Sequence, residues 1–183
     1  MKQVILDVVR AIQPYDELER QHRDDAMSWI LSDDSMYRQQ NPGKHIVSYF
    51  VLFDEKQGKL MLIDHVKAGL WLPTGGHVED GEHPRATVLR EADEELQLQA
   101  DFHEQFGDKP VFITVTQTKG AGTHTDVSLW YVLKGDSNQV FSYDPREMNG
   151  YKWMLLQDIL DTNVMELDPH MHRFVRKLQL ASC

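Results

Sequence analysis

Hydrophobic residues recur at helical spacing between residues 84 and 96. Val88, Ala92 and Leu96 follow one another at intervals of four, which places their side chains on one face of an α-helix. The proline at position 84 fits the first turn, where the backbone amides have no helical partner. The pattern therefore predicts a helix over 84–96 with one apolar face.

Segments rich in β-branched and aromatic residues predict a sheet on both sides of this helix. A hairpin is expected before it, with strands at 46–53 and 60–63 joined by a polar turn that contains Gly58. The other expected strands are 111–118, 125–133 and 151–155, and turns are predicted at 67–69, at the glycine pair 75–76, at 119–122 and at 135–138. Strands alternating with helices predict an α/β fold, an α/β/α sandwich with a mixed sheet.

Two further helices are predicted near the start of the chain. The first covers residues 1–12, and the second covers 15–31, where Asp16 and Glu19 form a candidate capping box. The apolar side expected for the first helix consists of Val4, Val8 and Ile12. The inward-facing residues expected in the second helix are Leu18, Ala26, Trp29 and Ile30.

A polar segment from 32 to 44, with a turn signal at Asn41-Pro42-Gly43, separates these helices from the rest of the chain. A segment of about 40 residues makes a poor core alone. We therefore expect residues 1–43 to be a helical N-terminal extension that packs on a domain formed by 44–183. The extension either joins two copies of the chain as a homodimer or covers a pocket of the domain.

The end of the chain predicts two more helices, a short one over 156–160 and a last one that begins at Asp168-Pro169. A capping residue followed by proline in the first turn is typical of a helix start. The inner face expected for the last helix consists of Met171, Phe174, Val175 and Leu178. These helices are expected to cover a face of the sheet.

Composition and charge narrow the classes of partner. The chain has 183 residues and a formal net charge of −10, which disfavours non-specific binding to nucleic acid polymers or to an anionic membrane. No apolar run approaches the length of a transmembrane helix. The single cysteine, Cys183, excludes an internal disulfide and fits a reducing compartment. We therefore expect a cytoplasmic protein that binds a small molecule.

Acidic side chains gather on the polar side of the helix predicted at 84–96. Glu91, Glu94 and Glu95 lie three and four residues apart and share a surface patch, and Arg90 can brace Glu94 from one turn away. Like charges at this spacing repel by about 0.2–0.5 kcal/mol per pair. A bound Mg²⁺ or Mn²⁺ ion would reverse the sign of that energy, because hard ions take oxygen ligands. The other interpretation is a solvated acidic helix face.

The wider string of residues favours the metal interpretation. Gly, five residues, Glu, seven residues and Arg-Glu-apolar-any-Glu-Glu resembles the signature of the Nudix hydrolases, the MutT-like superfamily. The matching positions are Gly76, Glu82, Arg90, Glu91, Ala92, Glu94, Glu95 and Leu98. Gln97 stands where the family has a glycine that ends the helix in a left-handed conformation. We expect Gln97 either to adopt a strained φ or to shift the end of the helix.

The resemblance is tight over 76–98 and looser over 44–178, and it implies an activity. Nudix enzymes use divalent cations to cleave diphosphates that are linked to another group, often a nucleoside. By resemblance, Glu94 and Glu95 are metal ligands, and Glu91 is a further ligand or the base for the attacking water. The implied protein is a Mg²⁺-dependent pyrophosphohydrolase, with Mn²⁺ as an alternative ion, that acts on a nucleoside diphosphate derivative or a nucleoside triphosphate.

The resemblance also implies roles for residues around these three glutamates. Arg90 looks like the residue that orients them. Glu82 looks like a secondary ligand from the preceding loop, and the backbone carbonyl of Gly75 like another ligand. Many Nudix enzymes carry an extra metal-binding glutamate in the loop before a late strand, which makes Glu147, six residues before Trp153, a candidate ligand. The other interpretation of Glu147 is a solvated loop residue.

Three polar residues are candidate substrate contacts. His77 lies within the predicted glycine turn, where it has no evident part in core packing. His124 and Asp126 are two residues apart, so on a strand both side chains point to one face. They could line a substrate pocket or contact a metal ion, and the other interpretation is a polar edge of the sheet.

Two other functions are compatible with the same fold. A diphosphate isomerase of this fold would need a catalytic cysteine in the pocket, whereas the cysteine of this chain stands at position 183. A non-catalytic nucleotide sensor would normally have lost a glutamate of the acidic helix, and none is missing. The sequence therefore favours hydrolysis.

Overall fold

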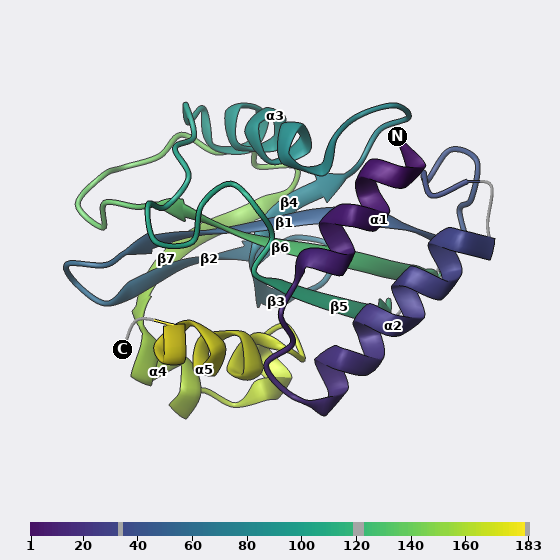
Figure 1. Ribbon diagram of the computed structural model, residues 1–183. Helices are drawn as coiled ribbons and strands as arrows, with labels where there is room; N and C mark the ends of the chain where they lie inside the picture. The colour runs from purple at the N-terminus through teal and green to yellow at the C-terminus, as the bar shows by residue number, and fades with distance from the viewer. Residues whose placement is uncertain (33–34, 119–122, 182–183) are drawn as a thin grey trace.

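The computed structural model describes residues 1–32, 35–118 and 123–181. In this part of the chain, helices cover both faces of a seven-stranded mixed sheet, which confirms the predicted α/β/α sandwich (Figure 1). The strands are β1 (Lys44–Asp54), β2 (Lys59–His65), β3 (Leu70–Leu72), β4 (Thr74–His77), β5 (Phe112–Gln117), β6 (Thr125–Lys134) and β7 (Met148–Leu155). The helices are α1 (Lys2–Ala11), α2 (Glu17–Ser32), α3 (Pro84–Leu96), α4 (Leu156–Asp161), the 3₁₀ helix η1 (Val164–Glu166) and α5 (Met171–Ala181). The described helices include none with the length and apolar character of a membrane span.

The sheet follows the order β3-β2-β1-β6-β5, with β4 added to β1 and β7 added to β2. β1 and β6 are parallel over Lys44–Phe53 of β1, and the other paired strands are antiparallel. The glycine pair predicted as a turn lies instead in β4, which pairs with Val47–Phe50 of β1. The turn prediction was wrong because a local glycine signal does not reveal a long-range strand partner. The turn predicted at 119–122 lies outside the described residues.

Alternating side chains of the central strands build a hydrophobic core on each face of the sheet. Phe50 and Leu52 of β1 pack with residues of α1, α2 and α3. Val51 and Phe53, which point the other way, pack with residues of α4 and α5. The four inner residues predicted for the last helix are all buried in this second core, which confirms that prediction. The helix itself starts at Met171, slightly later than expected.

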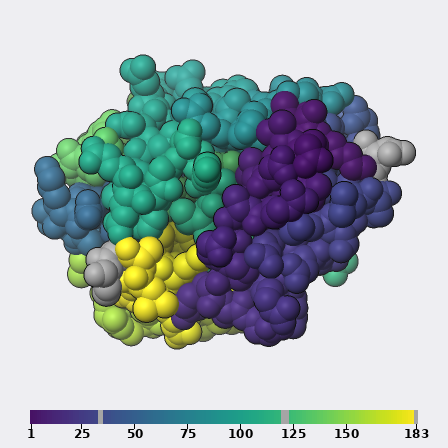
Figure 2. Space-filling view, viewed as in Figure 1, coloured from purple at the N-terminus to yellow at the C-terminus, as the bar shows by residue number. Residues whose placement is uncertain are grey.

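Helix α1 lies against the first of these cores, and α1 and α2 together form a large part of the surface in Figure 2. Its buried residues are Ile5, Leu6 and Val9, and Ile12, predicted on its apolar side, is buried directly after the helix ends. Val4 is 40% exposed, so the prediction that it belongs to the apolar side of this helix was wrong. The predicted apolar side and the observed buried side of this helix share Ile12. The observed side faces the core because its larger side chains, such as Ile5 and Leu6, remove more apolar surface from water.

Helix α2 contacts the core on its own side of the sheet and also helix α5, which covers the opposite side. Ala26 and Ile30 are buried as predicted, but Leu18 is exposed and Glu19 is buried in its place. The amide of Glu19 donates to the Asp16 carboxylate at 2.8 Å, as a capping box requires. The Glu19 carboxylate does not complete the box. It accepts from the amide of Tyr15 and from two groups outside α2, one on β5 and one on α5. A tertiary contact therefore overrides the local pattern at this end of α2.

Candidate active site

Helix α3 positions the acidic side chains, and its bounds are those predicted from the sequence. His83 caps its start, with Nδ1 accepting a hydrogen bond from the amide of Arg85 at 3.0 Å. Its end is Gln97, which adopts a left-handed conformation with φ of 50° and ψ of 38°. This confirms the first of the two expectations for Gln97. A side chain in that conformation costs about 1–2 kcal/mol.

Arg90 ties the acidic face of α3 to the loop before it. Its Nε and Nη2 donate to the two carboxylate oxygens of Glu82, each at 3.1 Å. Its Nη1 donates to Glu91 at 2.7 Å and to Glu94 at 3.3 Å, and Nη2 also donates to the carbonyl oxygen of His77 at 3.2 Å. The planar guanidinium suits such a forked arrangement. This geometry is the one expected of a residue that orients the glutamates.

Burial and hydrogen bonding together give these carboxyl groups different pKa values. Burial acts to raise the pKa of Glu82, but hydrogen bonds from Arg90 and two neighbouring groups outweigh it, so the pKa lies below its ordinary value. Burial raises the pKa of Glu91 even though Arg90 lies beside it. Burial also raises the pKa of Glu95 to about 7, against the effect of a hydrogen bond from Thr74. Glu91 and Glu95 are therefore carboxylates whose charge a bound cation would stabilise.

Two glycines of β4 allow α3 and β1 to approach the same strand. A β-carbon on Gly76 would overlap the carboxylate of Glu91, and one on Gly75 would overlap the backbone carbonyl of Ser48. Gly75 also has φ of 143°, a conformation that favours glycine. Its backbone hydrogen-bonds the Glu95 side chain. The predicted backbone ligand therefore lies beside one of the predicted metal-binding glutamates.

A cleft of about 1300 Å³ opens in front of these residues. Its lining includes three carboxylates of α3 and three cationic side chains: Glu91, Glu94, Glu95, Arg38, Lys67 and Arg146. A large cleft with a few polar groups of both signs is the usual form of a small-molecule site. The carboxylates suit a cation, and the basic side chains suit the phosphates of an anionic ligand.

The two glutamates predicted outside α3 lie in different places. Glu147 lines the cleft, with Lys67 Nζ 3.3 Å from its carboxylate. Glu82 lies outside the lining that the described residues form, and both of its oxygens accept hydrogen bonds from Arg90. In this conformation Glu82 braces Arg90, so a direct part in metal binding stays a prediction for it and for Glu147.

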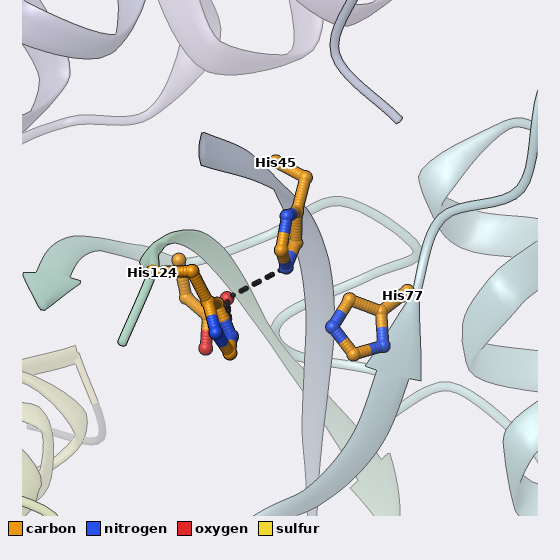
Figure 3. A group of neighbouring side chains, drawn as sticks. His45, His77 and His124 are labelled. Carbon is orange, nitrogen blue, oxygen red and sulfur yellow. Dashed lines mark ion pairs between the residues drawn. The ribbon is translucent and has the colours of Figure 1, made fainter. Parts of the chain in front are cut away.

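The predicted substrate contacts His77, His124 and Asp126 all line the same cleft. The alternative of a polar sheet edge is wrong for Asp126, because Asp126 lies on β6, between β1 and β5, whereas His124 directly precedes that strand. His45, which the sequence did not single out, joins these three residues (Figure 3). Thr74, which hydrogen-bonds Glu95, was also missed. Neither residue has a local signal, since both reach the site through strand pairing.

Several solved structures share this fold. A NUDIX-family hydrolase from Clostridium perfringens is 21% identical, with a TM-score of 0.56, and the match covers 74% of this chain and 97% of that one. The MutT protein from Methanosarcina mazei Go1 is 19% identical, with a TM-score of 0.57 and coverage of 75% and 94%. The NUDIX domain of Shewanella oneidensis NrtR, solved with ADP ribose, is 18% identical, with a TM-score of 0.56 and coverage of 85% and 97%.

These likenesses define the class of fold as that of the MutT-like Nudix hydrolases. The family model described as NUDIX domain matches residues 34–178, which is most of the chain. The chain therefore belongs to the Nudix family, and we assign it as a Nudix pyrophosphohydrolase. No curated protein sequence matches it.

Proposed function

We propose that this protein hydrolyses a pyrophosphate bond in a nucleoside diphosphate derivative or a nucleoside triphosphate, with Mg²⁺ or Mn²⁺ as its cofactor. The observation that carries the proposal is the convergence of Glu91, Glu94 and Glu95 on one cleft, with Arg90 bonded to two of them. The ADP ribose bound by the NrtR Nudix domain is a nucleoside diphosphate derivative. A ligand of that kind on the same fold supports this substrate class.

The donor set at the cleft suits a hard divalent cation. Carboxylate oxygens are the ligands that Mg²⁺ prefers, and Glu91, Glu94 and Glu95 are the residues proposed to hold it. The carbonyl of Gly75, Glu147 and Glu82 are further candidates. The raised pKa values of Glu91 and Glu95, which follow from burial, mark two carboxylates that gain from a cation. When bound, the ion supplies a water of lowered pKa and offsets phosphate charge.

Side chains of the protein position the reactants. Arg90 holds Glu91 and Glu94 through Nη1. Glu91, whose pKa is raised by burial, is the proposed acceptor of the proton from the attacking water. Water oxygen bonds to phosphorus, the bridging P–O bond breaks, and a phosphate-containing group leaves with the electron pair. Basic residues along the cleft, such as Lys67 and Arg146, contact the phosphates, and His77, His124 and Asp126 line the cleft beside the substrate.

A substrate screen with a matched pair of variants tests this function. Nucleotide sugars, dinucleoside polyphosphates, nucleoside triphosphates and coenzyme diphosphates are incubated with Mg²⁺, and release of phosphate or pyrophosphate is measured. Glu94→Gln is expected to lower kcat at least about 100-fold, equal to about 2.7 kcal/mol of barrier, while the fold is retained. Glu104→Gln, in an exposed residue outside this cleft, should leave kcat unchanged.

Two results would contradict the proposal. Equal kcat in the wild type and Glu94→Gln would remove Glu94 from the ligand set. A wild-type protein that hydrolyses none of these compounds but binds a nucleotide tightly would instead be the non-catalytic sensor.

We also propose that residues 1–43 are an integral extension of the domain formed by 44–183. Ile5 and Val9 lie in the same core as β1, and Glu19 pairs with Lys177 at 2.7 Å across the molecule. The homodimer and the cytoplasmic location stay predictions. Cys183, the one cysteine that a diphosphate isomerase could use, lies outside the described residues.

A further inference from the structure

Three imidazole rings and a carboxylate meet beside the cleft. His45 lies on β1, His77 on β4 and Asp126 on β6, while His124 directly precedes β6. Strand pairing brings them together, because His45 pairs with Asp126 in the parallel register and His77 pairs with Val47. One ligand atom of each residue lies within 4.8 Å of the others. Figure 3 shows the three rings turned toward a common point.

Hydrogen bonding fixes which nitrogen of His45 carries a hydrogen. Its Nδ1 lies 3.1 Å from the backbone carbonyl of Asn41, and a carbonyl only accepts, so Nδ1 donates. In the neutral ring Nε2 then presents a lone pair. That lone pair faces Oδ1 of Asp126 at 3.2 Å, although a carboxylate oxygen is also an acceptor. Two acceptors therefore face each other where His45 is fully buried.

His124 has a similar arrangement. Its Nε2 lies 3.2 Å from the same oxygen of Asp126, and its Nδ1 lies 3.3 Å from the hydroxyl of Thr118. Within the described part of the chain, Nε2 of His45, Nε2 of His77 and Oδ1 of Asp126 are buried atoms with no hydrogen-bond partner. Buried polar atoms are normally satisfied, so this cluster requires a shared proton or a cation.

We propose that His45, His77, His124 and Asp126 bind a divalent transition-metal ion, with zinc as the best fit, at a second site separate from the glutamates of α3. Three imidazole nitrogens and one carboxylate oxygen suit Zn²⁺ rather than Mg²⁺. Bonds of about 2.0–2.2 Å in a tetrahedron place neighbouring ligand atoms roughly 3.4 Å apart. Both contacts of Asp126, at 3.2 Å, are close to that spacing.

Contacts behind the rings have the form of a metal-binding site. The Nδ1 atoms of His45 and His124 face a carbonyl and a hydroxyl oxygen, and such contacts orient histidines that bind a metal through Nε2. His77 needs one local change, because Arg38 approaches its Nδ1 at 3.5 Å. Arg38 is exposed, so its side chain can turn to solvent and leave Nδ1 of His77 to carry the hydrogen.

The position of His77 links this site to the catalytic cleft. Its backbone carbonyl accepts a hydrogen bond from Arg90 at 3.2 Å. An ion that holds the His77 ring therefore also fixes the part of β4 against which Arg90 is braced. The second ion is inferred to be structural.

Cobalt binding in the presence of excess Mg²⁺ tests the proposal. The full chain without an affinity tag is freed of metal with a chelator, saturated with Mg²⁺, and titrated with Co²⁺. We expect one Co²⁺ per chain, with the visible absorption of a four- or five-coordinate ion, and displacement by an equal amount of Zn²⁺. His77→Asn should weaken binding at least about 100-fold. His45→Asn, which keeps a donor toward Asn41, should do the same.

Two control variants separate the sites. His172→Asn changes another half-buried histidine, on α5, whose Nε2 faces the carbonyl of Thr162, and it should bind Co²⁺ like the wild type. Glu95→Gln changes the carboxylate site and should also keep the ion. Thermal unfolding shows whether each variant is folded. If His45→Asn does not fold, His77→Asn is sufficient for the test, because His77 is less buried than His45.

Either of two results overturns the second metal site. One is a wild-type chain without tight Co²⁺ binding, which would leave a proton shared between His45 and Asp126. The other is loss of the ion in Glu95→Gln together with its retention in His77→Asn, which would place the ion among the glutamates of α3.

Discussion

Removal of Lys177 tests how much the ion pair between Glu19 of α2 and Lys177 of α5 contributes to the free energy of unfolding. Glu19 of α2 is completely buried and accepts a hydrogen bond from Lys177 Nζ at 2.7 Å. Its other donors are backbone amides, of Tyr15 at 2.6 Å and Ile113 at 3.3 Å. Lys177→Met keeps most of the packing volume but leaves the carboxylate without its cation. Breaking a buried ion pair in this way destabilises a protein by about 3–5 kcal/mol.

The loss should depend on pH, and its sign follows from the pKa of Glu19. Burial raises this pKa above its ordinary value of 4.5 even with Lys177 present, and removal of the lysine raises it further. A carboxyl group with a higher pKa in the folded than in the unfolded state destabilises the fold above the folded pKa. That destabilisation is relieved as the pH falls through the folded pKa toward 4.5. The cost of Lys177→Met should therefore be largest near neutral pH and smaller in acid.

Urea unfolding, followed by tryptophan fluorescence at neutral and acid pH, measures this free energy. With a slope of about 2 kcal/mol/M, the expected loss lowers the midpoint by about 2 M. The double variant Glu19→Gln/Lys177→Met should recover most of the loss, because no charge is then buried. Lys134→Met, which removes two exposed ion pairs, should cost less than about 1 kcal/mol. A cost for Lys177→Met equal to that control, or one independent of pH, would refute the reasoning.

Two further predictions concern β4 and the end of α3. Gly76→Ala places a methyl group where the carboxylate of Glu91 lies, so kcat should fall about 100-fold because that carboxylate is misplaced. The control Gly150→Ala meets no atom within 4 Å and should keep the wild-type kcat. Equal kcat values for the two variants would contradict this prediction. Gln97→Gly removes a strained side chain at φ of 50° and should stabilise the fold by about 1 kcal/mol, or about 2–4 °C in Tm by calorimetry. An unchanged or lower Tm would show that this conformation is not strained.

Local patterns predicted the parts of the fold that depend on near neighbours. The bounds of α3 and the inner face of α5 follow from apolar spacing along single helices. The spacing of Glu91, Glu94 and Glu95 was enough to place them on one cleft. These features were accessible because helical geometry converts sequence separation directly into position on a face.

Features that depend on distant partners were not accessible. His45 reaches Asp126 only through the parallel pairing of β1 with β6, and no local pattern specifies that register. Leu18 was expected to be buried, but the ion pair with α5 turns Glu19 inward instead. Strand β4 was hidden because two glycines give a turn signal in any sequence context.

Helix α2 has a consequence for how molecules of this protein meet one another. β5 is the last strand on its side of the described sheet, and such a border offers unpaired backbone groups to a strand from another chain. Side chains of α2 occupy that border at Ile113, where Glu19 accepts from its amide and His22 hydrogen-bonds its backbone. The N-terminal segment therefore covers part of this sheet edge and hinders its pairing with a strand of another chain, the kind of pairing that leads to aggregates.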